Sequence, residues 1–133
     1  MKALPTAEIA FQPRPGLHAP ELIAFLSLSE AEFRQRFRTS PILRAKRRGF
    51  LRNVAVALGN LKALDAVPAL IRSLDDEEPV VRGHVAWALG QIGAQTALDP
   101  LHRRLRAEND ADVQEELRQA IGILSGASAD LPV

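Results

Sequence analysis

Apolar residues recur along most of this chain at steps of three or four, which is the period of one face of an α-helix. In the middle of the chain, Val81, Val85, Ala88 and Ile92 form one such stripe, with Leu89 at its edge. No segment shows the strict alternation of apolar and polar residues that is typical of a half-buried strand. The pattern therefore predicts an all-α protein.

Three segments of the chain resemble one another, which indicates internal repeats. They are RNVAVALGNL from Arg52, GHVAWALGQIG from Gly83 and LRQAIGILSG from Leu117, and their Leu–Gly or Ile–Gly pairs lie 31 and then 32 residues apart. A second series falls between them, with VPALIRSL starting at Val67 and DPLHRRL at Asp99. Each repeat therefore consists of two helices, and we expect an α-α superhelix of about three helix pairs.

The repeats divide the chain into three parts. We expect an extended N-terminal segment over residues 1–19, a repeat domain over residues 20–126 and a flexible tail over residues 127–133. Within the domain, the first, basic repeat covers about 28–61, the second about 65–93 and the third about 96–125.

The composition excludes several classes of protein and site. No apolar run approaches the roughly 20 residues that span a bilayer, so we expect no membrane segment. The first residues, MKALPTAEIAFQPRP, lack the continuous apolar stretch of a signal peptide, which favours the cytoplasm. The chain has no cysteine, which excludes disulfides, thiolate metal sites, iron–sulfur clusters and a cysteine nucleophile.

The net charge of +1 conceals an uneven distribution of charge along the chain. The segment from Arg34 to Arg52 holds eight arginine and lysine residues and no acidic residue. From Asn53 onward there are 12 acidic against 7 basic residues, and Asp75 to Glu78 is the densest acidic cluster. A basic end of this kind attracts polyanions.

The basic segment predicts two helices. Ser29 and Glu32 have the spacing of a capping box, which opens a short helix in which Phe33 and Phe37 face inward. Pro41 begins the second, longer helix, whose expected core stripe is Leu43, Phe50, Val54, Leu58 and Leu61.

Three arginines of the second helix, Arg44, Arg48 and Arg52, follow one another at steps of four and share one face. Their spacing is comparable to that of phosphates along a nucleic-acid strand, so RNA is a natural partner. A solvated basic face and a contact with a partner protein are the alternatives. Arg47 falls among the apolar positions, which indicates either a side chain that reaches past the core or one held by a buried acid or carbonyl.

The segment EEPVVRGHVAWALGQIG, residues 77–93, resembles the second helix of a short HEAT repeat. In such repeats an acid in the turn between the helices pairs with the arginine after the valine. The resemblance implies that Asp75 or Asp76 pairs with Arg82. The third copy has Asp112–Val113–Gln114 instead, so we expect this series of pairs to end there.

The basic segment carries a more specific resemblance. A helix of the form L-S-E-x-x-F-x-x-x-F begins at Leu28, and the pattern R-x-K-R-x-G-x-x-R-N begins at Arg44. Both are similar to the segment that follows the catalytic part of tRNA epoxyqueuosine reductase. The resemblance extends from about Leu17 to Leu124.

Members of that family are oxidoreductases that act in queuosine modification of tRNA and use a cobalamin and two [4Fe–4S] clusters. A chain without cysteine lacks the cluster ligands, so we expect a non-catalytic fragment that has no cofactor of its own. The resemblance implies a tRNA-facing role for Arg44, Lys46, Arg47, Arg48 and Arg52. The alternative is a scaffold for a protein partner, such as the missing catalytic part.

Other chemistry-bearing residues have simpler interpretations. His18, His84 and His102 lack metal-ligand spacing. The acids from Asp75 to Glu78 are typical of a turn before a helix N-terminus, although they could supply an acid/base pair or bind a cation. We expect the Trp87 side chain to pack between repeats, and stacking against a nucleic-acid base is the alternative.

Overall fold

The computed structural model describes residues 19–129, of which residues 127–129 are described by their backbone alone. Every regular element in this part of the chain is a helix, which confirms the all-α prediction. Residues 1–18 and 130–133 lie outside the described residues, so most of the expected N-terminal segment and tail is not tested. Helices in the described residues are neither long enough nor apolar enough to cross a membrane.

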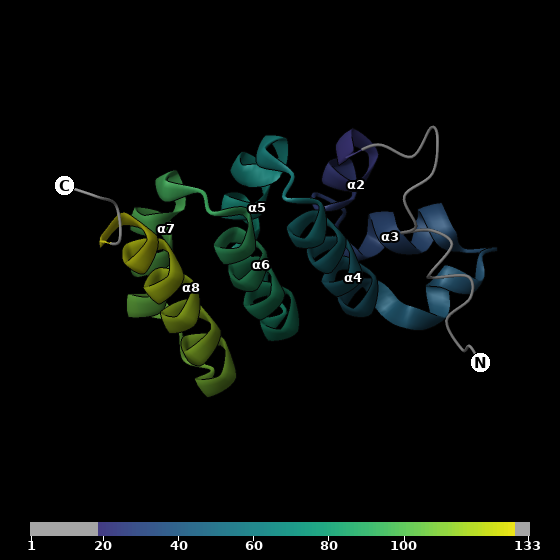
Figure 1. Cartoon of the computed structure of the whole chain (residues 1–133). Coiled ribbons are helices and arrows are strands. Elements are labelled where there is room, and N and C mark those ends of the chain that lie inside the picture. The colour runs from purple at the N-terminus through teal and green to yellow at the C-terminus, as the bar shows by residue number, and fades with distance from the viewer. Residues whose placement is uncertain (1–18, 130–133) are drawn as a thin grey trace, which may run out of the picture.

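The helices stand side by side in a row that runs from one end of the molecule to the other (Figure 1). The α-helices are α2 (Ala19–Phe25), α3 (Glu30–Phe37), α4 (Lys46–Leu61), α5 (Val67–Ser73), α6 (Pro79–Ile92), α7 (Leu98–Ala107) and α8 (Ala111–Ala129). Short 3₁₀ helices precede three of them, namely η1 (Pro41–Ala45), η2 (Leu64–Ala66) and η3 (Gln95–Ala97). The helix α8 continues three residues beyond residue 126, where we had expected a tail to begin.

The long helices α4, α6 and α8 form one layer, in which α4 packs on α6 and α6 packs on α8. Behind them, α2 packs on α4, α5 on α6 and α7 on α8. The pairs α5–α6 and α7–α8 are the second and third repeats. In the first repeat α4 packs mainly on α2 and less on α3, so this repeat begins before residue 28, where we expected it to start. The stack has the expected form of an α-α superhelix of helix pairs.

Local signals in the sequence set several of the helix ends. The Ser29 hydroxyl accepts a hydrogen bond from the Glu32 backbone N–H at 3.1 Å, and the Glu32 carboxylate accepts one from the Ser29 N–H at 2.8 Å. The predicted capping box is therefore confirmed. Pro79 is the first residue of α6, and Gly93 ends that helix with a left-handed φ of 81°.

The core runs through the whole stack and is built from leucine, valine and alanine, with an aromatic cluster in the first repeat. Phe37 and Phe50 each contact Phe25, Phe33 and one another, with ring centroids 5.0 to 6.0 Å apart. The predicted stripe is buried at Phe50, Val54 and Leu58, but Leu61 is 50% exposed. Leu61 is the last residue of α4, and Lys62 ends that helix in the left-handed conformation, so none of the described helices covers Leu61.

The repeated glycines mark the points where neighbouring long helices approach most closely. A Cβ on Gly59 would lie 2.6 Å from Trp87 Cζ3 and 3.1 Å from Ala88 Cα, so α4 and α6 meet there. A Cβ on Gly90 would lie 3.3 Å from Ala120 Cα, where α6 meets α8. Gly122 is the third copy and has nothing within 4 Å, because no described helix packs against that face of α8.

These distances predict a graded response to alanine. We expect Gly59→Ala to lower the free energy of unfolding by about 1 to 2 kcal/mol, because overpacking outweighs the gain in helix propensity. Gly122→Ala should raise it by about 0.5 to 1 kcal/mol, since the new methyl group meets open space. Gly90→Ala should fall between the two. Urea unfolding followed by circular dichroism measures all three, and a Gly59→Ala variant more stable than Gly122→Ala would contradict this account.

Candidate nucleic-acid interface

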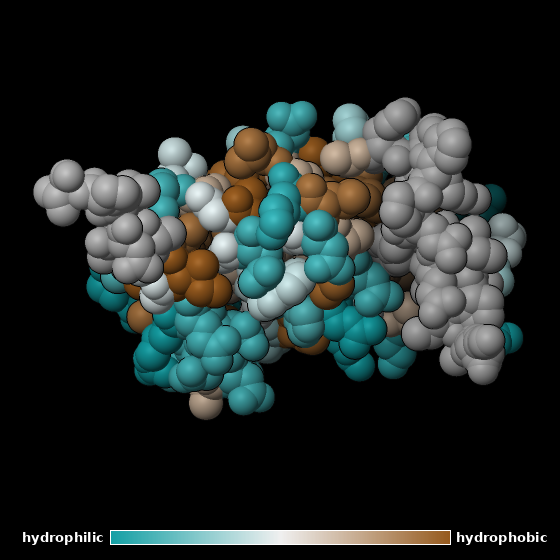
Figure 2. Space-filling model, viewed as in Figure 1, coloured by the Kyte–Doolittle hydropathy of each residue, from teal (hydrophilic) through white to brown (hydrophobic). Residues whose placement is uncertain are grey.

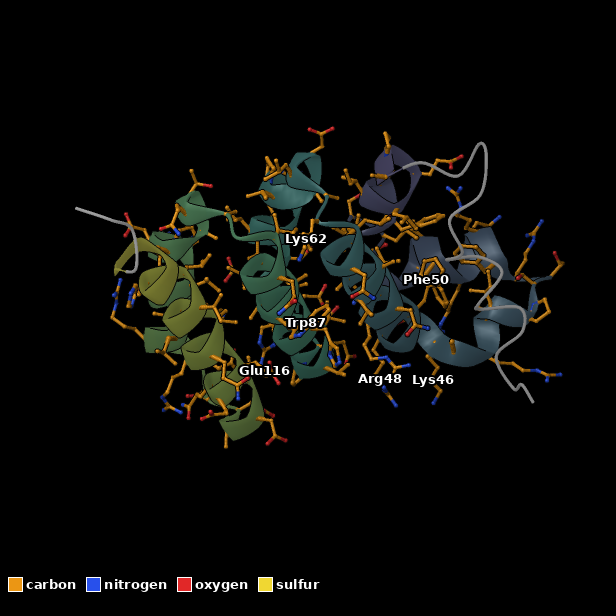
Figure 3. All side chains as sticks on the ribbon, in the orientation of Figure 1. Lys46, Arg48, Phe50, Lys62, Trp87 and Glu116 are labelled. Carbon is orange, nitrogen blue, oxygen red and sulfur yellow. The ribbon has the colours of Figure 1, made fainter. Side chains whose placement is uncertain are left out.

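A basic groove of about 570 Å³ lies at the end of the stack formed by the first repeat. Lys46 and Arg48 line it from the N-terminal end of α4, where both side chains project away from the ribbon (Figure 3). Arg34 and Arg38 line it from the other side, on α3 and directly after that helix. The remaining lining residues are Glu30, Phe33, Leu43 and Glu78. We call this site the basic groove.

The two arginines from the α3 side were not among the site residues selected from the sequence. Both belong to the run of basic residues that starts at Arg34, so composition contained a signal for them. The sequence does not show that they lie beside Lys46 and Arg48, because this depends on how α3 and α4 are placed relative to each other. Arg34 Nε lies 2.9 Å from Glu30 Oε2, but the two side chains are 73% and 48% exposed. Such an exposed pair is weak, so Arg34 remains free to contact an anion.

The backbone breaks between η1 and α4, which corrects the expected row of three arginines. Lys46 has a φ of 63°, and the helix that we expected to run on from Pro41 is two separate elements. Arg44 belongs to the 3₁₀ helix η1, whereas Arg48 and Arg52 belong to α4. Arg44 is exposed, but it does not continue the line of Arg48 and Arg52.

Arg52 lies one turn beyond Arg48 on α4 and is half-buried. Its Nε and Nη2 donate to the side-chain oxygen of Asn53 at 3.3 and 3.2 Å. This contact orients the guanidinium without neutralising its charge. Arg52 is therefore a charged neighbour of the basic groove and not one of its lining residues.

Arg47 is not available to a nucleic acid, which corrects its selection as an RNA contact. Its side chain is 8% exposed and forms a two-pronged ion pair with the Asp76 carboxylate. Arg47 Nε donates to the carbonyl oxygen of Leu28 at 2.8 Å. The hydrogen bonds to Asp76 raise the pKa of Arg47 above its ordinary value, against the opposing effect of burial. Of the two interpretations drawn from its position, the one in which a buried acid and a carbonyl hold it is confirmed.

The expected pair between Arg82 and Asp75 or Asp76 was also wrong in its partner. Arg82 forms a two-pronged ion pair with Glu108, at 2.8 and 2.7 Å. It reaches its own turn only through the carbonyl oxygen of Asp76, at 2.8 Å. The Asp75 carboxylate instead accepts from Arg104 Nη1 at 3.1 Å.

The buried arginines therefore link successive repeats. Arg47 joins the first repeat to the turn of the second, and Arg82 joins the second to the residues before α8. Gln114 occupies the corresponding place in the third repeat and donates to the carbonyl oxygen of Glu108 at 2.7 Å. Among the described residues, the series of arginine pairs ends at this copy, as expected from the sequence.

The four cationic side chains of the basic groove can bind an anion. Within the described residues, no group of three or more His, Cys, Asp or Glu side chains is placed to hold a metal ion. His84 lies on α6 and His102 on α7, and His18 is outside the described residues. Trp87 is half-buried, with its ring edge against Gly59, so it packs between repeats as expected.

Comparison with known proteins agrees with this architecture. The family described as HEAT repeats matches residues 40–122. The chain is 33% identical over 114 residues to an uncharacterised protein of Geobacillus stearothermophilus, an alignment that covers 85% of this chain and 53% of that protein. It is also 42% identical to the epoxyqueuosine reductase of Shigella dysenteriae, in an alignment of 86 residues that covers 65% of this chain and 23% of the reductase.

A solved structure of an epoxyqueuosine reductase with an epoxyqueuosine-modified tRNA stem loop is also similar. It superposes with a TM-score of 0.74 at 30% identity, over 78% of this chain and 28% of the reductase chain. The resemblance seen in the sequence is thus confirmed. The chain spans about half the length of the Geobacillus protein and less than a third of the reductases. The extent of the repeat match and the paired helices show that this chain belongs to the HEAT-repeat family.

Proposed function

We propose that this chain is a non-catalytic RNA-binding module that contacts tRNA through the basic groove. The epoxyqueuosine reductase reaction would be catalysed by a separate catalytic part that is not in this chain. The observation that carries the proposal is the gathering of Arg34, Arg38, Lys46 and Arg48 around one groove. The similarity to reductases, one of which was solved with a tRNA stem loop, indicates which polyanion to test. An RNA partner also fits the cytoplasmic location expected from the sequence.

The charges around the groove favour a phosphate backbone as the ligand. Four cationic side chains face two carboxylates, those of Glu30 and Glu78, so the groove keeps a positive net charge. Figure 2 shows hydrophilic side chains along much of the lower edge of the stack, on which the N-terminal ends of the long helices lie. Arginine and lysine contacts to phosphates supply most of the affinity of such surfaces and release counterions on binding.

We infer that the chain contributes no redox step. The [4Fe–4S] clusters that the resemblance implies are held by cysteine thiolates, and this sequence has no cysteine. The residues present do not fit such a cluster. The cobalamin and the clusters would belong to a catalytic part outside this chain, and we assign it binding alone.

The test is a fluorescence-anisotropy titration of a labelled tRNA anticodon stem loop. We expect the double variant Lys46→Glu/Arg48→Glu to weaken binding at least about tenfold at about 50 mM salt, because two phosphate contacts become repulsive. The slope of log affinity against log salt should also become shallower by about one to two units.

Arg103→Glu/Arg106→Glu is the matched control, since it makes the same change of charge at two exposed positions of α7. We expect this variant to bind the stem loop within about threefold of the wild type. Equal weakening by both variants would mean that the stem loop responds only to total charge, and the proposal would fail. No binding by the wild-type chain at low salt would also overturn it.

A further inference from the structure

A second groove, of about 650 Å³, lies between α6 and α8 on the layer of long helices. Val80, Trp87 and Val113 give it apolar walls. Asp112, Glu115 and Glu116 line it from the first turns of α8. We call this site the acidic groove. Its volume is in the range of grooves that hold ligands or the side chains of a bound peptide.

The charge in the acidic groove is opposite to that in the basic groove. Its lining residues, all within the described part of the chain, include four carboxylates and no lysine or arginine. Asp110 is used internally, because its side chain accepts from the Val113 N–H at 3.0 Å. Glu115 forms an exposed pair with Arg118, at 3.6 Å, and accepts an exposed hydrogen bond from Gln119 Nε2 at 3.2 Å. Asp112 and Glu116 have no ion-pair partner among the described residues, so their charges are available to a ligand.

The wall formed by α6 is shaped by a missing side chain and a fixed aromatic ring. Gly83 lines the groove, and a Cβ there would lie 3.8 Å from Glu116 Cγ. A large residue at this position would therefore extend into the space beside Glu116. The Trp87 ring is held in place by its contact with Gly59 on α4. Figure 3 shows Trp87 on α6 and Glu116 on the adjoining part of α8.

A hydrogen bond fixes the orientation of His84 in the same groove. His84 Nδ1 lies 2.8 Å from the carbonyl oxygen of Val80, and because a carbonyl can only accept, Nδ1 donates. The carboxylates and the aromatic ring of this groove together suit a ligand that carries N–H donors, positive charge and apolar area.

We propose that the acidic groove binds a basic, partly apolar segment of a partner protein, with arginine or lysine side chains against Trp87, Asp112 and Glu116. Guanidinium and ammonium groups bind both carboxylates and the faces of aromatic rings. The apolar walls suit the aliphatic parts of the same side chains and their apolar neighbours. An RNA backbone is repelled by the four carboxylates, so the two grooves select different classes of macromolecule.

Trp87 provides a direct readout, because it is the one tryptophan of the chain. The probe is a synthetic peptide of alternating arginine and leucine, which does not fluoresce at tryptophan wavelengths. We expect a saturable change in Trp87 emission with this peptide and none with a glutamate–leucine peptide. No saturable change with the basic peptide, or an equal change with the acidic one, would overturn the proposal.

Charge reversal in the groove tests the site itself. Glu115→Lys/Glu116→Lys should weaken binding of the basic peptide at least about tenfold. Glu115→Gln/Glu116→Gln preserves the shape and should give a smaller loss. Asp65→Lys/Asp99→Lys, two exposed acids outside the groove, is the matched control and should bind within about threefold of the wild type. Equal losses in the groove and control variants would show only general attraction between charges.

Titration with the tRNA stem loop separates this proposal from the RNA-binding function. The groove variants should keep the RNA affinity of the wild type, and the stem loop should not displace the basic peptide. If the stem loop displaces the peptide and changes Trp87 emission in its place, the groove binds RNA and the inference of a protein partner is wrong. If the basic-groove variant loses RNA binding while the acidic-groove variants keep it, the result supports separate sites for RNA and for the basic peptide.

Discussion

Replacing Asp76 with alanine is expected to lower the free energy of unfolding by about 3 to 5 kcal/mol, because it leaves the buried Arg47 guanidinium without its counter-charge. The two side chains are each 8% exposed. Only the Leu28 carbonyl would remain as a partner of Arg47. Asp76 also accepts from the Glu78 N–H at 3.0 Å, which adds a smaller loss at the start of α6. A domain of ordinary stability, whose free energy of unfolding is about 5 to 15 kcal/mol, would lose a large share of that free energy.

Asp75→Ala is the matched control for this prediction. Asp75 is the adjacent residue and is also ion-paired, but its side chain is 69% exposed. We expect a loss of no more than about 1 kcal/mol. The double variant Arg47→Met/Asp76→Ala removes both buried charges and should recover most of the loss seen in Asp76→Ala. Urea unfolding measures all the variants, and similar losses for Asp75→Ala and Asp76→Ala would contradict the account.

The repeats and their core could be predicted from the sequence because both depend on local periodicity. Leu58–Gly59 and Leu89–Gly90 recur where long helices cross, since close approach requires small residues. The apolar stripes at steps of three or four place Val54 and Val85 in the core. The prediction that Leu61 is buried is wrong because burial also needs a neighbouring helix. The periodicity within α4 does not show where that neighbour ends.

The partners of the buried arginines could not be predicted, because they lie in the next repeat. Arg47 conflicts with the apolar pattern of its helix, but its acidic partner Asp76 is 29 residues away in the sequence. The repeat alignment does not help, since Arg47 lies eleven residues before Leu58 whereas Arg82 lies seven residues before Leu89. Relative to these leucines, the helix α4 starts two residues earlier than α6, and Arg47 lies one helical turn earlier than Arg82. Arg47 and Arg82 thus both form an ion pair with the next repeat, although their positions in the repeats do not align.

The basic groove was only partly predictable for a related reason. The run of basic residues indicated the end of the molecule on which the groove lies. The sequence does not indicate the break at Lys46, because a positive φ is usually marked by glycine and this residue is a lysine. The contribution of Arg34 and Arg38 depends on that change of direction. The line of Arg44, Arg48 and Arg52 assumed a continuous helix and was wrong for Arg44.

The second large effect concerns Glu108, whose side chain is fully buried. Burial alone raises the pKa of Glu108, but hydrogen bonds from Arg82 and from the Asp110 N–H, with the charges of Arg82 and Arg104, together lower that pKa below its ordinary value. Arg104 Nε lies 3.2 Å from Glu108 Oε1 as an ion pair without hydrogen-bond geometry. We expect Glu108→Gln to lower the free energy of unfolding by about 3 kcal/mol at pH 7, because two arginines lose their shared carboxylate.

The same variant predicts a change in the dependence of stability on pH. A carboxylate whose pKa is lower in the folded state stabilises the fold above its unfolded value and loses that contribution as the pH falls through the folded value. The difference in unfolding free energy between the wild type and Glu108→Gln should therefore shrink as the pH is lowered below about 4.3, the ordinary value for glutamate.

The control is Glu115→Gln, because the Glu115 side chain is 59% exposed and its two contacts, a long pair with Arg118 and a hydrogen bond from Gln119, both lie on the surface. This variant should keep the pH dependence of the wild type, since an exposed carboxylate gains little from folding. Urea midpoints measured from about pH 7 to about pH 3 compare the three proteins. If Glu108→Gln loses stability with falling pH as steeply as the wild type and the Glu115→Gln protein, then Glu108 does not couple proton binding to folding. The inter-repeat pair with Arg82 would then contribute packing alone.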